Sequence, residues 1–222
     1  MTEAAHKLVK FPNLRERVYK ILKGMIVSQE FPPGVKIDEE QLAKQLGVSR
    51  TPIRESLLRL ENEGIVKIIP RRGASIVRHS REKIVELLLL REVLEGFAAR
   101  LVAKNINETV LEKMKSLFRP FSKSNIRDRS KQYTQADMDF HNLVISTSKN
   151  SFLINMANVL NDHIQMLRLR TVSLKGRPEH SLQEHLMILQ ALEDRRPALA
   201  ESLMKKHIEN VRGSVMKNID AD

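Results

Sequence analysis

Hydrophobic residues at helical spacing mark the first third of the chain. Apolar positions recur every three or four residues over 14–26, and Pro32-Pro33-Gly34 cannot continue that helix. A second, short helix is predicted after Asp38, whose side chain is suited to cap it, and Gly47 suits the left-handed residue at its end. A third helix is predicted after Ser49, a residue type favoured at the N-cap position. The pattern therefore predicts three helices joined by tight turns.

The spacing after the third helix changes to one typical of strands. Residues 65–69 are mostly β-branched, Pro70-Arg71-Arg72-Gly73 has the composition of a turn, and residues 75–77 can pair back on the first strand. Beyond the hairpin only helical spacing recurs, and about six helices are expected there. The predicted fold is mostly α: an N-terminal winged helix-turn-helix with a small β-hairpin in residues 1–79, followed by an all-helical bundle in residues 80–222.

Composition narrows the class of partner. The 222 residues include 38 Lys and Arg against 27 Asp and Glu, a net charge of +11, which favours a polyanion such as nucleic acid or an anionic membrane surface. No cysteine is present, which excludes disulfides, cysteine-based zinc modules and a thiol nucleophile. The longest uncharged apolar run is Leu87–Leu90, far shorter than a membrane span, and no signal-peptide core is evident. We therefore expect a cytoplasmic protein with no membrane partner.

A basic first turn follows Gly47, in the arrangement that places a helix N-terminus in the major groove of DNA. Arg50 and Arg54 lie four residues apart and share one helix face, where an arginine fork can contact guanine or phosphate. The residues expected at double-stranded DNA are Ser49, Arg50, Thr51 and Arg54 on this helix and Arg71, Arg72 and Gly73 at the hairpin tip. The alternative is a solvated helix face and an ordinary polar turn, but the combination of features favours DNA binding.

Four residues of the helical part have the types and spacing of metal ligands. Asp137 and His141 lie four residues apart and project from one face of a helix. His185 and His207 lie eleven residues before and after Arg196, so an antiparallel helix hairpin would bring them opposite each other. One carboxylate and three imidazoles suit Zn²⁺, Ni²⁺, Mn²⁺ or Fe²⁺. The alternative is an ion pair between Asp137 and His141, with two hydrogen-bonded histidines at helix edges.

Three motifs of the N-terminal part occur in the predicted helices and hairpin. They are EQLA at 40–43, LGVSRTPIRE at 46–55 and LENEGIV at 60–66. Together they resemble the DNA-binding domain of the GntR family of bacterial transcriptional regulators. The resemblance implies that Arg50, Thr51 and Arg54 contact the operator and that Gly73 lies in the wing, whereas Glu40 stands where some members carry an arginine.

The helical part carries a second set of motifs. They are REVLE at 91–95, Asp137-x-x-Phe140-His141, Glu184-His185 and Met204-x-x-His207. They resemble the FCD effector domain of the FadR subfamily, whose members often hold a divalent metal through an Asp and three His and bind small organic acids beside it. The resemblance implies that the ligands are Asp137, His141, His185 and His207. Arg91 is then the candidate partner of the effector carboxylate, with an ion pair to Glu95 on the helix surface as the alternative.

The function expected from these features is that of a ligand-responsive transcriptional regulator, with repression as the expected sign. A homodimer, which the resemblance implies, would place two winged domains on a two-fold operator, and an organic acid would change their separation. One alternative is a metal-dependent enzyme on a DNA-binding tether, because Asp/His₃ with open positions can activate water. No general base is evident near the ligands, so an enzyme is not expected. Another alternative is an architectural DNA binder without sequence preference.

Overall fold

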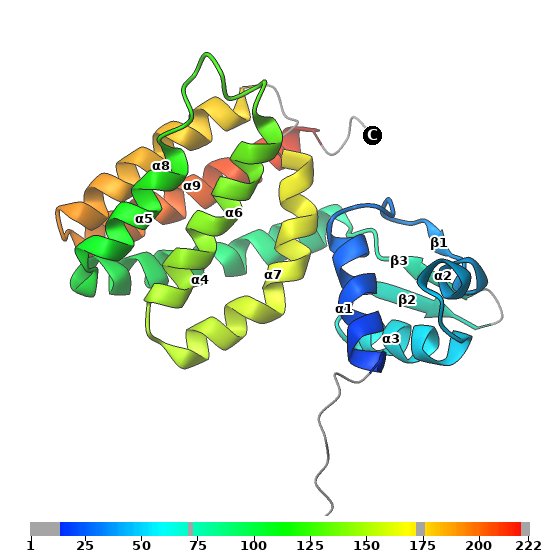
Figure 1. Cartoon of the computed structure of the whole chain (residues 1–222). Coiled ribbons are helices and arrows are strands. Elements are labelled where there is room, and N and C mark those ends of the chain that lie inside the picture. Colours follow the sequence, from blue (N-terminus) through cyan, green and yellow to red (C-terminus); the bar gives the residue numbers. More distant parts are fainter. Residues whose placement is uncertain (1–13, 71–72, 172–175, 219–222) are drawn as a thin grey trace, which may run out of the picture. The chain divides into compact units, whose positions relative to one another are not determined.

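The computed structural model describes residues 14–70, 73–171 and 176–218, with only the backbone described at 168–171. The chain forms two compact units, Met1–Arg78 and His79–Asp222 (Figure 1). Each unit has its own buried core, and each is described by itself below. The predicted fold class is confirmed, since the first unit is a small winged helix-turn-helix and the regular elements of the second unit, among its described residues, are all helices.

The first unit contains three helices and a small antiparallel sheet. The elements are α1 (Leu14–Val27), β1 (Lys36–Ile37), α2 (Glu39–Leu46), α3 (Arg50–Asn62), β2 (Val66–Ile69) and β3 (Gly73–Ile76). The predicted hairpin is confirmed as β2 and β3, and β1 pairs with the other edge of β3 to give the order β1-β3-β2. Strand β1 was not predicted, because two residues are too few to show an alternating pattern.

The N-terminal caps of α2 and α3 differ from each other. Asp38 accepts hydrogen bonds from the backbone N–H groups of Glu40 and Gln41, and Gly47 takes the left-handed conformation with φ of 64°, both as predicted. Ser49 occupies the N-cap position of α3, but its side chain makes no capping hydrogen bond. The predicted N-cap position is therefore confirmed, and one of the two usual donors to a cap is missing because the third residue of α3 is Pro52, which has no N–H.

The second unit is a bundle of long helices. They are α4 (Arg81–Asn105), α5 (Glu108–Phe118), α6 (Ser130–Thr147), α7 (Ser151–Thr171), α8 (Arg177–Glu193) and α9 (Pro197–Asn218). Helix α4 packs along α9 and also contacts α6, α7 and α8, so it is the central helix of the unit. Helices α8 and α9 form the predicted hairpin across Arg195, whose φ of 49° allows the tight reversal. None of the described helices is long and apolar enough to span a bilayer.

Candidate functional site

The predicted DNA-reading side chains of α3 are exposed and share one acidic partner. Arg50 and Arg54 are 55% and 63% exposed, and Ser49 and Thr51 beside them are also exposed. Glu39, at the start of α2, accepts a 2.7 Å hydrogen bond from Arg54 Nε, and its carboxylate lies 3.8 Å from Arg50 Nη2. Glu39 therefore holds both guanidinium groups together on the surface. The sequence analysis missed this role, which depends on how α2 packs against α3.

The wing is only partly described. Gly73 begins β3 with φ of 85°, a conformation that favours glycine, and it lines an open groove together with Arg50 and Arg54. Arg71 and Arg72, the other two residues expected at DNA, lie outside the described residues.

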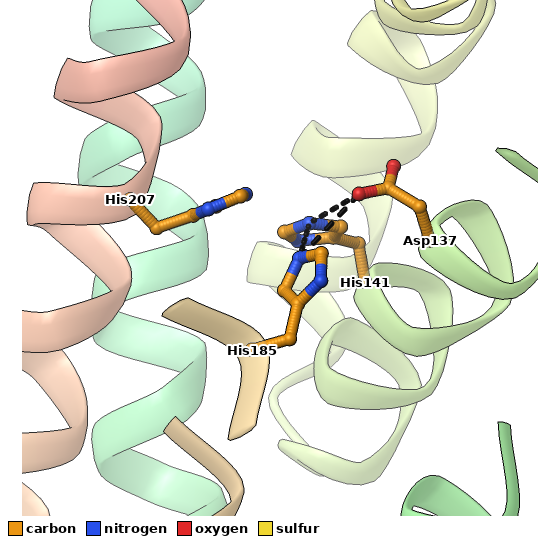
Figure 2. A group of neighbouring side chains, drawn as sticks. All are labelled: Asp137, His141, His185 and His207. Atoms are coloured by element: carbon orange, nitrogen blue, oxygen red, sulfur yellow. Dashed lines mark hydrogen bonds and ion pairs between the residues drawn. The ribbon is translucent and has the colours of Figure 1, made fainter. Parts of the chain in front are cut away.

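The four predicted metal ligands come together in the interior of the helical unit. One ligand atom from each of Asp137, His141, His185 and His207 lies within 4.8 Å of the others. Asp137 and His141 come from α6, His185 from α8 and His207 from α9. Figure 2 shows Asp137, His141 and His185 gathered together, with the His207 ring reaching toward them from its own helix. All three histidines are 0–1% exposed, and the Asp137 side chain is 13% exposed.

The distances between ligand atoms match those around a metal ion. His185 Nε2 lies 3.3 Å from His141 Nε2 and 3.4 Å from Asp137 Oδ1, and His141 Nε2 lies 3.7 Å from that oxygen. Two ligands at zinc bond lengths of about 2.0–2.1 Å are about 3.3 Å apart in a tetrahedron. The residues present therefore fit a divalent ion without rearrangement of these three groups.

Glu184 sets the protonation of His207. His207 Nδ1 lies 2.6 Å from Glu184 Oε2, and because an ionised carboxylate only accepts, Nδ1 must carry the hydrogen. The lone pair is then left on Nε2, which is buried without a hydrogen-bond partner among the described residues. A buried acceptor without a donor is costly in a protein, but it is the arrangement that a metal ligand requires.

The pKa values of this pair favour the same protonation states. Burial lowers the pKa of His207 to about 4, although its hydrogen bond to Glu184 opposes that shift. Burial alone would raise the pKa of Glu184, but hydrogen bonds from His207 and Arg177 outweigh burial and lower it to about 2. At neutral pH His207 is therefore a neutral imidazole beside an ionised carboxylate.

The Nδ1 atoms of the other two histidines, His141 and His185, also contact polar side chains. His141 Nδ1 contacts Glu95 Oε2, and the other oxygen of Glu95 accepts a 2.7 Å bond from Arg91 Nε. The Tyr133 hydroxyl lies 3.2 Å from His185 Nδ1. With its Nδ1 against a carboxylate, His141 directs its Nε2 lone pair toward Nε2 of His185. The two Nε2 atoms lie 3.3 Å apart, a distance at which they can share one hydrogen or bind one cation between them.

Arg91 is buried rather than on the helix surface. Its side chain is only 2% exposed and forms the ion pair with Glu95 that the sequence analysis held as an alternative, but in the interior. The expectation of a surface pair is wrong because α4 is covered along its length by α9 and contacted by three more helices. Arg91 Nη2 has no hydrogen-bond partner among the described residues, and Arg91 lines a cavity of about 30 Å³ between His141 and residues of α7.

The outer partners of the histidines were missed by the sequence analysis, apart from the pairing of Arg91 with Glu95. Two series of contacts of the same kind lead to the cluster of candidate ligands: Arg91, Glu95 and His141 form one, and Arg177, Glu184 and His207 form the other. The sequence places Glu184 next to His185, but the carboxylate of Glu184 contacts His207 of α9 instead.

Comparison with family models identifies both units. Residues 14–76 match the model described as "Bacterial regulatory proteins, gntR family", and residues 86–210 match the FCD domain. Among curated relatives, the chain is 32% identical over 195 residues to the uncharacterized HTH-type transcriptional regulator YdhC of Bacillus subtilis, with 86% of each chain covered. It is 24% identical over 202 residues to the HTH-type transcriptional repressor RspR of Escherichia coli, covering 91% of this chain and 89% of that one.

Solved structures share the fold. E. coli McbR/YncC superposes with a TM-score of 0.77 at 18% identity, over 95% of this chain and 100% of that one. The Zn²⁺-bound FCD domain of TM0439 matches with a TM-score of 0.54 at 21% identity, over 65% of this chain and 99% of that one. At these identities the likeness concerns the fold.

Proposed function

This chain belongs to the gntR family of bacterial regulatory proteins, and we propose that its FCD domain senses a small organic acid at a bound divalent metal ion. The chain is a DNA-binding transcriptional regulator and not an enzyme, in line with the names of its relatives. The alternative of a metal-dependent enzyme on a DNA-binding tether therefore does not hold. We further propose that it represses its target genes and that its ion is Zn²⁺, Ni²⁺, Mn²⁺ or Fe²⁺.

The observation that carries the proposal is the orientation of the ligands. Asp137, His141, His185 and His207 converge, and an outer partner of each histidine engages Nδ1, so that the three Nε2 atoms are left for the ion. When bound, the ion supplies positive charge that attracts the carboxylate of an acid. A structural ion pair would need neither three outer partners nor a buried acceptor left open on His207.

Arg91 is proposed to contact the acid. Arg91 lines the cavity that also touches His141, and its Nη2 has no hydrogen-bond partner among the described residues, so one guanidinium could hold Glu95 and an incoming carboxylate together. The cavity of about 30 Å³ has room for little more than one water molecule. An organic acid must therefore enlarge it, which requires movement of α7 or of the side chains that α7 contributes. That movement supplies the differential affinity on which regulation depends.

A direct test compares operator affinity with and without effector. Zinc-loaded protein is titrated with operator DNA in the presence of each acid of a small panel, and with scrambled DNA at the same salt concentration. A coupling of about 1–3 kcal/mol would change operator affinity roughly 5–150-fold. Equal affinity for operator and scrambled DNA would instead support an architectural binder. No response to any acid in a protein that holds its metal would contradict the sensor.

Replacing Arg54 should weaken operator binding. We propose that Ser49, Arg50, Thr51, Arg54, Arg71, Arg72 and Gly73 form the DNA-binding surface, with Arg54 reading a base. Arg54→Ala should then cost about 1–3 kcal/mol on the operator. The measurement is fluorescence anisotropy at fixed salt. Arg59→Ala is the control, because Arg59 lies on the same helix but pairs with Glu16. Equal losses in both variants would remove Arg54 from the interface.

Exposed apolar stripes on α4 and α7 are proposed to bind a second copy of the chain. On α7, Phe152, Met156 and Val159 are 81%, 62% and 74% exposed and share one helix face. On α4, the exposed apolar side chains at the same kind of spacing are Leu90, Val93 and Phe97. Large apolar side chains gathered in this way are typical of protein interfaces rather than of free surface.

A charge placed in either stripe should prevent dimer formation. Val93→Glu and Val159→Glu would each bury an unpaired carboxylate against the second copy, at a cost of several kcal/mol. Both variants should run as monomers in size-exclusion chromatography with light scattering. Leu186→Glu is the control, because Leu186 is 50% exposed on α8, outside both stripes. Dimers in all three variants would contradict the proposed interface.

A further inference from the structure

The second unit has another, larger pocket, whose lining shares no residue with that of the Arg91 cavity. It is open, has a volume of about 600 Å³ and lies between the start of α8 and the second half of α9. Pockets of about 300–1,000 Å³ are the usual size for small-molecule ligands. Its polar lining consists mainly of Arg177, His180, Arg212, Lys217, Glu184 and Asn210.

Arg177 is a buried arginine in the lining of this pocket. It is only 7% exposed, although a guanidinium is costly to bury, and it forms a two-pronged pair with Glu184 through Nη1 at 3.2 Å and through Nη2. Its Nε, however, is buried with no hydrogen-bond partner among the described residues. Because Arg177 lines the pocket, a rotation of its guanidinium group would turn this unused donor toward an oxyanion bound there.

The charges around the pocket are compatible with an anion. Glu209 pairs with Lys206 at 2.8 Å, and Glu184 accepts from Arg177, His207 and Asn210, so both acids of the lining are already engaged. Arg212 lies 3.7 Å from its nearest acid, Glu92, in a loose contact. The basic groups of the lining are thus less neutralised than the acidic ones.

We propose that this pocket binds a small oxyanion through Arg177, and that Glu184 couples the anion to the metal ligand His207. Glu184 touches both ends of this path, because its Oε2 contacts Arg177 Nη2 and lies 2.6 Å from His207 Nδ1. An anion that shares the charge of Arg177 leaves Glu184 less neutralised. His207 then becomes a stronger ligand, so the anion raises the affinity for the ion, and the ion raises the affinity for the anion by the same factor.

The anion site is tested on the full-length protein by thermal melting at constant ionic strength. Chloride is replaced by sulfate in one arm and by succinate in the other, which separates a tetrahedral oxyanion from a carboxylate. We expect a saturable rise in Tm in at least one arm. Arg212→Gln should abolish the rise, because it removes a cation of the lining that does not touch Glu184. Arg100→Gln is the matched control, since Arg100 also pairs with a glutamate between α4 and α9 but lies outside this pocket. No rise in either arm, or an equal rise in both variants, would overturn the site.

The coupling, which rests on the metal centre proposed above, is tested by zinc affinity in competition with a chelator. The anion that binds should raise zinc affinity about fivefold or more in the wild type. Glu184→Gln keeps the shape of the side chain but removes its charge, so it should bind the anion and lose this dependence. If zinc affinity is the same with and without the bound anion, or is lower with it, the proposed coupling is wrong. If the protein takes up no zinc, the metal centre itself fails, and the anion site is still decided by the melting experiment.

Discussion

Removal of the metal ion should lower the Tm of the helical unit by roughly 8–16 °C. A ligand present at 1,000 times its Kd stabilises the folded state by about 4 kcal/mol, and each kcal/mol shifts the Tm of a domain of this size by about 2–4 °C. The cause lies in the buried cluster: without the ion, the open acceptor on His207 and the facing nitrogens of His141 and His185 stay buried with no cation between them. Calorimetry before and after treatment with a chelator, followed by addition of zinc, measures the difference.

The variant His185→Gln tests whether this cluster is the site that binds the stabilising ion. The variant should contain no stoichiometric metal by elemental analysis and should melt at the same temperature with or without chelator, while it still binds DNA. His180→Gln is the matched control, because it replaces an exposed histidine on the same helix and should keep the metal. If the chelator leaves the Tm of the wild type unchanged, the ion does not occupy this cluster.

Arg91→Ala should destabilise the helical unit by about 3–5 kcal/mol, or roughly 6–20 °C in Tm. The substitution removes the 2.7 Å ion pair between Arg91 and the buried Glu95 carboxylate, and breaking a buried ion pair by removing one partner is strongly destabilising. Because Glu95 also holds His141, metal affinity should fall as well. The sequence alone predicts loss of effector binding with the metal retained, and the buried chain of contacts changes that expectation.

Two further variants separate these effects. Arg100→Ala removes another arginine of α4, but one that is 45% exposed and pairs with Glu201 on the surface, so it should cost no more than about 1 kcal/mol. Arg91→Met with Glu95→Gln removes both charges and should recover much of the stability without restoring metal affinity. Equal melting temperatures of Arg91→Ala and Arg100→Ala would show that the buried pair is not important for folding.

Much of the fold and the four candidate ligands followed from local patterns. The turn residues around Gly47 and the β-branched run after α3 specify their own conformations, because they act within a few residues. The short reversal at Arg195 places residues at equal distances from it side by side, which brought His185 and His207 together with ring centroids 4.5 Å apart. The spacing of Asp137 and His141 needs only the helix repeat.

The outer partners of the histidines could not be read in the same way. Glu184 is next to His185 in the chain, yet successive residues point about 100° apart on a helix, and its side chain meets His207 of α9 instead. Arg91 could equally have faced solvent, because α4 carries apolar residues around most of its circumference and its pattern does not single out a buried face.

For this protein, the sequence by itself was enough to predict two units, a basic helix and four candidate metal ligands, since helix repeats, turn residues and the short reversal between two helices act over a few residues. Which atoms of the ligands are left for an ion, which arginines are buried and which pockets they line were decided only when the helices packed. Those features depend on the rotation and crossing of neighbouring helices, and that is set by the close fit of many side chains distant in the chain.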